Sequence, residues 1–325
     1  MITQKLASAF ATAIDRGPLI MTQAAGRLAM AEAQKRFLNR RYLLRRIHGY
    51  RMLLDTEDSG LSRSLLLFRT REVDHKVMLE RILRPGMMVF DIGGNIGYYP
   101  LMELSLLNGS GRMVVVEPSP ANVELLKKNL ALNGYHGVPV IEAAVSDKPG
   151  TRTFYLSKQS NLGTFHPIGT GASTLSGDTV AVETTTVPAL AKQYGAPDLL
   201  RMDVEGHEVE VINGMLDDIR GGNYAPIIIF ETHLSRYSDE HDMAATLRAL
   251  FALGYAVPLL SSSSDHGTER LKALGYRPGE RIATDGIHRT LFSDIKPDDA
   301  IDIICRTGGA RTVVLSKRPN GGGAA

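Results

Sequence analysis

The sequence has only one cysteine and no long apolar run. Cys305 has no second cysteine to pair with, so a disulfide within the chain is excluded, which fits a reducing compartment. No run reaches the roughly 18 apolar residues of a membrane span. Asp15 and Arg16 interrupt the apolar N-terminus, so we expect no secretory signal and a cytoplasmic protein. The formal net charge of only +2 gives no overall field for nucleic acid, and we expect no nucleic-acid partner.

What the chain does have is an apolar fraction of 43% over 325 residues, enough for one large α/β domain with an appendage. Good helix formers dominate residues 1–70, which predicts a helical N-terminal extension. We expect the main domain over residues 71–317. The Gly/Ala-rich residues 318–325 are typical of a flexible tail.

The stretch 35–51 contains seven basic residues and no acidic one, interleaved with apolar residues. One interpretation is a basic amphipathic helix that touches anionic lipid or a glycolipid substrate. The other is a solvated cationic surface. The N-terminal helices could also pack on a second subunit, which would make the protein a homo-oligomer.

A glycine turn after an apolar run is the feature around which the chain is organised. Residues 88–99 are typical of a buried strand, a tight turn and a helix. Glycines there permit positive φ and close approach of a ligand, and the helix start offers unpaired N–H groups. The spacing is not that of a dinucleotide fold. It is the D-x-G-x-x-x-G pattern of S-adenosylmethionine methyltransferases, in which the acid can face the amino group of the cofactor. The predicted cofactor contacts here are Asp91, Gly93, Gly94, Asn95 and Gly97.

Two further strand ends carry acids at the positions that a nucleotide-like cofactor requires. Glu117 and Pro118 end the second strand, 26 residues beyond Asp91, where a carboxylate can accept both ribose hydroxyls. Glu142 and Ala143 end the third, where an adenine would lie. Three strand–helix steps in register are more specific than any one, although each acid alone is also compatible with a surface role.

The motif combination resembles the FkbM-type methyltransferases over about residues 70–260. This resemblance implies a class I methyltransferase fold: a Rossmann-like α/β sheet, mostly parallel with one reversed strand, that binds S-adenosylmethionine. It also implies O-methylation of sugars or natural products, with some members acting on peptide nitrogen. Typical members have alanine where Gly94 stands and lysine where Arg201 stands. The motifs are residues 89–99 (VFDIGGNIGYY), 116–120 (VEPSP), 142–147 (EAAVSD) and 203–208 (DVEGHE).

Two acid-plus-histidine pairs follow the fourth and fifth strands, where the acceptor is expected. The pairs are Asp203 with His207, and Glu231 with His233; Asp203 also belongs to the predicted cofactor set. One interpretation is that a histidine or carboxylate, with His207 as first choice, is the general base for an acceptor hydroxyl. A second is a divalent cation, Mg²⁺, held by Asp203, Glu231 and His233. A third is that these groups only hydrogen-bond loops.

The remaining segments are assigned more coarsely. Residues 157–177 predict a lid over the acceptor side, and residues 261–286 a second acceptor loop. Closing strands are expected over 299–306 and 312–317, and Cys305 in the first of them should be buried in the core.

The sequence therefore predicts an enzyme that moves a methyl group from S-adenosylmethionine to a hydroxyl. The acceptor is a small molecule or glycan: a sugar, glycolipid or natural product. The alternatives are N-methylation of a peptide side chain and an inactive cofactor-binding module.

Overall fold

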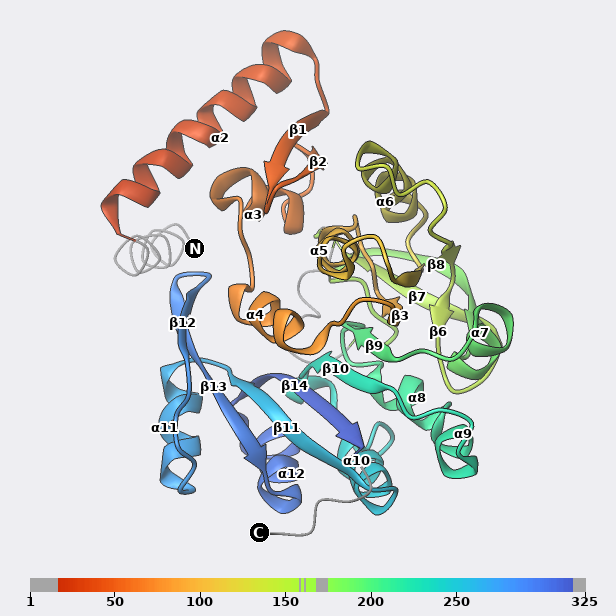
Figure 1. The fold of residues 1–325 in the computed structure, drawn as a ribbon. Coiled ribbons are helices and arrows are strands. Elements are labelled where there is room, and N and C mark those ends of the chain that lie inside the picture. The colour runs from red at the N-terminus through yellow and green to blue at the C-terminus, as the bar shows by residue number, and fades with distance from the viewer. Residues whose placement is uncertain (1–16, 158, 161, 168–174, 318–325) are drawn as a thin grey trace.

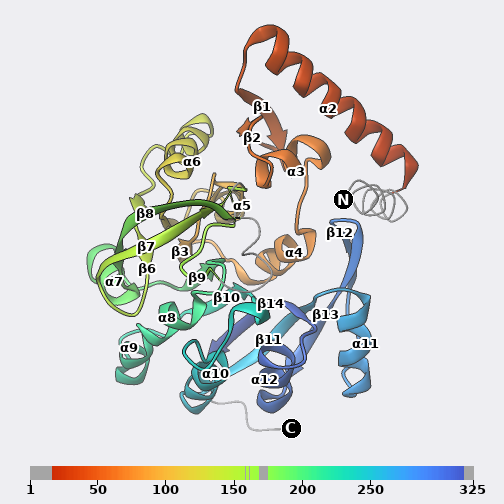
Figure 2. The same ribbon diagram turned by 180° about the vertical axis from the view of Figure 1, so that it is seen from behind.

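The computed structural model describes residues 17–157, 159–160, 162–167 and 175–317. An N-terminal unit precedes a large α/β domain (Figures 1 and 2). The unit consists of α2 (Pro18–Leu38), the hairpin β1 (Tyr42–Ile47) and β2 (Tyr50–Asp55), and α3 (Leu61–Phe68). Helix α4 (Val73–Ile82) leads from it into the sheet. The expected tail 318–325 lies outside the described residues.

The basic stretch 35–51 is not the amphipathic helix that the sequence suggested. Helix α2 ends at Leu38, and Asn39 follows in the left-handed conformation. Leu43 and Ile47 are buried while the residues between them are more exposed, the period-2 alternation of a strand. His48 and Gly49, both with positive φ, form the tight turn. The extension is therefore mixed rather than all-helical, and its contact with membrane or with a second copy remains a prediction.

Nine strands form the central sheet, in the order β12-β13-β11-β14-β10-β9-β3-β4-β5. The strands from β10 to β5 are mutually parallel, and β14 runs antiparallel to both of its neighbours, β10 and β11. This is the mostly parallel class I sheet with a reversed closing strand. The bounds are β3 (Met88–Ile92), β4 (Arg112–Glu117), β5 (Val140–Glu142), β9 (Leu199–Met202), β10 (Ile227–Glu231), β11 (Tyr255–Ser262), β12 (Arg281–Thr284), β13 (Ile287–Ile295) and β14 (Ala310–Lys317).

Two features of the C-terminal region differ from expectation. The polar stretch 261–286 is not an acceptor loop: it contains α11 (Asp265–Ala273) and β12, and β13 after it is a second reversed strand. The end of β12 supports the start of α4, since the Val73 N–H donates to the Thr284 hydroxyl at 2.9 Å. The expected strand 299–306 is α12 (Pro297–Cys305), and Cys305 is only half-buried.

Helices cover both faces of the sheet. Successive residues of β3 point to opposite faces of the sheet. Phe90 belongs to the apolar core on one face and Val89 to the apolar core on the other. One face is covered by α4, α5 (Tyr98–Leu107) and α6 (Pro120–Leu132). The other is covered by α7 (Val187–Tyr194), α8 (Glu208–Asn213), α9 (Leu216–Gly221), α10 (Met243–Ala252) and α12.

A three-stranded sheet stands beside the central one. Its order is β6-β8-β7, and the strands are β6 (Ala144–Val145), β7 (Gly150–Ser157) and β8 (Leu175–Thr185). Among the described helices, none combines the length and the apolar character that crossing a bilayer would take.

Candidate active site

A cavity of about 360 Å³ opens at the carboxyl ends of β3, β4 and β9. This edge is where open α/β sheets bind ligands, and the volume falls in the range of small-molecule sites. The residues predicted from sequence that line it are Gly93, Gly94, Asn95, Glu117, Pro118, Ala143, Asp203 and His207.

The glycine turn packs against the end of β9. Gly93 has φ +84°, and a Cβ there would meet the Asp203 carbonyl oxygen at 2.3 Å, so only glycine fits. The N–H groups of Gly93 and Gly94 donate to the Val116 carbonyl at 2.8 and 3.2 Å, which ties the turn to β4. Gly97 also has positive φ, but it packs on Leu126 and does not line the cavity. Its role is structural.

Glu117 is held at the cavity wall by three donors. The N–H groups of Asn95 and Ser119 and the amide of Asn122 lie 2.9, 3.0 and 3.0 Å from its carboxylate oxygens. Burial raises the pKa of Glu117 to about 7, against the lowering effect of these hydrogen bonds. The carboxylate is thus fixed in place before any ligand arrives.

Asp91 does not face the cavity, contrary to the sequence prediction. It shares with Val89 the face of β3 that lies under α5, and its side chain is fully buried. Its Oδ1 lies 3.6 Å from Nη1 of Arg201. Burial raises the pKa of Asp91, although Arg201 opposes the shift. The acid therefore anchors a cation inside the domain instead of meeting the cofactor's amino group.

Glu142 also lies elsewhere than the sequence predicted. It is exposed and does not line the cavity, whereas Ala143, Ala144 and Val145 do. Side chains alternate across a strand, so the acid at the end of β5 points away from the wall that its alanine neighbour forms.

Within its described part, the segment after β7 lines the cavity beside the wall that carries Glu117, and its role as an acceptor-side lid remains a prediction. The Ser160 carbonyl accepts from the side-chain amides of Asn95 and Asn122 at 2.9 and 3.0 Å. The Ser160 N–H and hydroxyl donate to Asp58 at 3.0 and 2.8 Å. Sequence reasoning missed Asn122 and Asp58, since nothing in the order of residues showed that the N-terminal unit would meet this segment.

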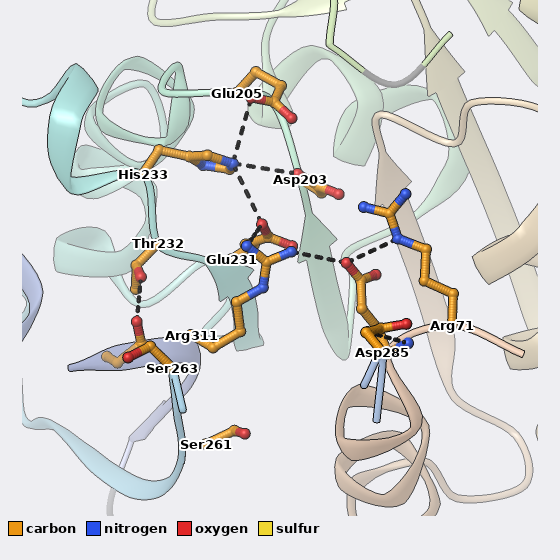
Figure 3. A network of polar contacts seen from close by, with 12 residues as sticks. Arg71, Asp203, Glu205, Glu231, Thr232, His233, Ser261, Ser263, Asp285 and Arg311 are labelled. Atoms are coloured by element: carbon orange, nitrogen blue, oxygen red, sulfur yellow. Dashed lines mark hydrogen bonds and ion pairs between the residues drawn. The ribbon is translucent and has the colours of Figure 1, made fainter. Parts of the chain in front are cut away.

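An acidic cluster adjoins the cavity beyond β9 and β10. Nε2 of His233 lies 3.7 Å from carboxylate oxygens of Asp203, Glu205 and Glu231, as Figure 3 shows. Nδ1 of His233 is 2.9 Å from Glu208. These carboxylates, Glu208 first, outweigh burial and raise the pKa of His233 to about 10, so the imidazole is a cation at neutral pH.

Asp203 and Glu205 are the members of this cluster that line the cavity. Glu205 adopts positive φ of +51°. Burial raises the pKa of Glu205 to about 7, with His233 opposing the shift. A carboxylate that titrates near neutral pH at a cavity wall has the properties of a general base. Glu205 belongs to the motif 203–208, but the sequence gave no reason to prefer it to the other acids as the base.

His207 does not fit the general-base role for which it was the first choice. Helix α8 starts at Glu208, so His207 precedes it and does not share a helical face with Asp203. Its Nε2 is 3.0 Å from the Ser146 hydroxyl, and its Nδ1 is 3.0 Å from Nε2 of His166. Since both ring nitrogens bond to the protein, neither is left for an acceptor hydroxyl.

Mg²⁺ does not fit the cluster of Asp203, Glu231 and His233, although their ligand atoms lie within 4.8 Å of one another. The Arg311 guanidinium already contacts the Glu231 carboxylate, and His233 is itself cationic. A protonated imidazole repels a metal ion and has no free lone pair for it. Internal cations therefore balance these acids.

Glu72 links the N-terminal unit to this network. It accepts from Arg71 at 3.1 Å, from Arg311 at 2.8 Å and from the Tyr99 hydroxyl. Burial raises its pKa, but the two arginines reverse the effect and hold the pKa of Glu72 well below its usual range. Arg71 and Glu72 both line the cavity.

The Methyltransferase FkbM domain model matches residues 91–257, more than half of the chain. The chain belongs to the FkbM methyltransferase domain family. The match covers the glycine turn, Glu117 and the acidic cluster, so the FkbM domain contains most of the cavity wall.

Three relatives are similar over part of their length. Hexuronic acid methyltransferase AglP of Haloferax volcanii is 29% identical over 150 residues, 45% of this chain and 56% of that protein. Protein-L-isoaspartate O-methyltransferase of Methanothrix thermoacetophila is 37% identical over 59 residues, 18% and 28% of the two chains. This FkbM chain thus spans about half or less of the curated relatives it matches. The solved structure of Methyltransferase FkbM from Methylobacillus flagellatus KT has a TM-score of 0.35 at 14% identity, over 71% of this chain and 53% of that one.

Proposed function

We propose that this protein transfers a methyl group from S-adenosylmethionine to a hydroxyl of a sugar, glycolipid or natural product. The supporting observation is one cavity with two chemically different walls. One wall has the glycine turn and Glu117, and the other has Asp203 and Glu205. The first suits a nucleoside and the second suits a hydroxylated acceptor.

Residues that would hold the donor are the backbone of Gly93 and Gly94, the Glu117 carboxylate, and Ala143 and Ala144. Glu117 can accept hydrogen bonds from ribose hydroxyls, and the small side chains leave room for a flat base. When bound, S-adenosylmethionine supplies an electrophilic methyl group on a sulfonium.

Glu205 is the general base in this proposal. The Glu205 carboxylate would accept the hydroxyl proton as the acceptor oxygen takes the methyl group from the sulfonium of bound S-adenosylmethionine, which would leave as a neutral thioether. Asp203 orients the acceptor by accepting a hydrogen bond from a second hydroxyl, and Nε2 of cationic His233 lies 3.7 Å from both carboxylates.

A sugar acceptor is favoured by the name of one relative, which acts on hexuronic acid. The test is methyl transfer from labelled S-adenosylmethionine to a panel of glucuronides, neutral glycosides and peptides. We expect label in a glycoside and none in peptides. Label only on peptide nitrogen would overturn the acceptor class, and donor binding without transfer to any acceptor would favour the inactive module.

A further inference from the structure

A second cluster of metal-ligating side chains adjoins the cavity, which its member His207 lines, and takes no part in the proposed reaction. It brings together His166, from the segment after β7, His207, just before α8, and Glu210, within α8. Each offers one ligand atom, and the three atoms lie within 4.8 Å of one another. The two histidines are 7% and 1% exposed.

The distances between the three ligand atoms are close to those expected around a single metal ion. His166 Nε2 is 3.0 Å from His207 Nδ1, His207 Nδ1 is 3.2 Å from Glu210 Oε2, and His166 Nε2 is 3.9 Å from Glu210 Oε2. Ligands at roughly 2.0–2.2 Å from a tetrahedral zinc ion lie about 3.3–3.6 Å apart. Small shifts of flexible side chains would bring all three edges of this triangle to that length.

The surroundings already orient the ligand atoms. The Ser146 hydroxyl, 3.0 Å from Nε2 of His207, fixes that ring with Nδ1 toward the centre of the triangle. His241 bonds to the other oxygen of Glu210, Oε1. Glu210 Oε2 is buried and carries no hydrogen bond from any residue that the structure describes. Metal-binding histidines and carboxylates commonly have such outer partners.

This cluster and the one around His233 differ in the charged groups that contact their histidines and carboxylates. There, Arg311 contacts Glu231 directly, and three further carboxylates lie around one ring. Here, the Arg236 guanidinium contacts the backbone carbonyl of His166 and leaves the Nε2 of that ring directed at His207. Two imidazoles and one carboxylate form a donor set that suits zinc rather than magnesium.

We propose that His166, His207 and Glu210 bind one divalent cation of the zinc type, with water completing the tetrahedron. The ion has a structural consequence at the cavity. Phe165 lines the cavity and its ring centroid lies 4.7 Å from that of His207. A cation that joins His166 to His207 therefore fastens the lid segment to the start of α8.

The test is metal content and Co²⁺ spectroscopy on the full-length protein. After treatment with chelator and dialysis, we expect one equivalent of Zn²⁺ to be taken up, and Co²⁺ to give the intense visible bands of a tetrahedral site. His166→Gln and Glu210→Gln should abolish both signals. Ser146→Ala removes only the outer hydrogen bond and should weaken Zn²⁺ binding about 10- to 100-fold.

Two control variants make the assignment specific. His136→Gln alters an exposed histidine and should leave uptake unchanged. His233→Gln should also leave uptake unchanged, since that residue belongs to the other cluster. Circular dichroism checks that each variant is folded. The proposal is overturned if wild-type protein takes up no Zn²⁺ or Co²⁺, or if His233→Gln abolishes uptake while a folded His166→Gln retains it. Neither readout depends on methyl transfer.

Discussion

Arg201 and Asp91 form an ion pair inside the domain, with side chains that are 2% and 0% exposed. The Arg201 guanidinium also lies over the ring of Tyr99, 3.8 Å from its centroid, and 3.4 Å from Asp203. Arg201 thus connects the core beneath α5 to the acceptor side of the cavity. Glu103 lies beside Asp91, and burial together with this acid raises the pKa of Glu103 well above its usual range.

Removing the charge of Arg201 should destabilise the protein severely. Arg201→Met leaves Asp91 buried without its cation, a loss of about 3–5 kcal/mol in the free energy of unfolding. Arg201→Lys keeps the charge, although it loses the flat stacking on Tyr99, so a smaller loss is expected. Urea denaturation of both variants measures this. Equal stability of Arg201→Met and wild type would contradict a structural role for the pair.

Activity should depend on pH through Glu205. Its pKa is raised to about 7, so below pH 7 the group is protonated and cannot accept the hydroxyl proton. At saturating donor and acceptor we expect the rate to fall about tenfold per pH unit below 7. Glu205→Gln should lower kcat roughly 10²- to 10⁴-fold and remove this dependence. The control, Glu240→Gln, alters an exposed acid. An unchanged pH profile in Glu205→Gln would assign the base elsewhere.

Glu117 should contribute to donor affinity, and Glu142 should not. Glu117→Gln replaces a buried carboxylate at the cavity wall with a weaker acceptor, whereas Glu142→Gln changes an exposed acid outside it. We expect S-adenosylhomocysteine to bind Glu117→Gln about 10- to 100-fold more weakly, the size of one hydrogen bond to a charged group. Calorimetry on both variants measures this affinity. If Glu142→Gln weakens binding as much as Glu117→Gln, the assignment of the two strand ends is wrong.

Gly94 should not tolerate substitution by alanine. A Cβ at Gly94 would lie 2.2 Å from Cγ1 of Val115, a stiff β-branched side chain in β4. Gly94→Ala alone should therefore cost about 1–3 kcal/mol of stability through overpacking. Adding Val115→Ala removes the clash, so the double variant should be more stable than the two single costs predict. Additive costs in a double-mutant cycle would show that the two positions do not compete for this space.

The sequence predicted the sheet better than the site. Apolar runs at residues 88–90, 112–116 and 227–230 identified buried strands, because parallel strands covered on both faces are mostly apolar. The direction of Asp91 could not be predicted in the same way. It depends on which face of β3 carries α5 and on the arginine that arrives from β9, and both are set by packing of distant segments.

The hairpin of β1 and β2 was missed for a related reason. Its basic residues and leucines fit a helical period nearly as well as a strand period, and propensity favoured the helix. The sequence also did not show why Glu205, rather than His207, is proposed as the base. This choice follows from the partners of each side chain, Ser146 and His166 in one case and His233 in the other.

The first 72 residues contribute Arg41, Asp55, Glu57, Asp58, Leu61, Arg71 and Glu72 to the cavity wall. The family match begins only at Asp91, after all of them. A protein trimmed to the matched region would thus keep the Glu117 carboxylate yet lose Asp58, the residue to which Ser160 donates its hydrogen bonds. Substitutions in this unit would therefore change the size and charge of one side of the cavity while leaving the matched domain untouched, so the range of molecules that the cavity admits can be altered from outside that domain.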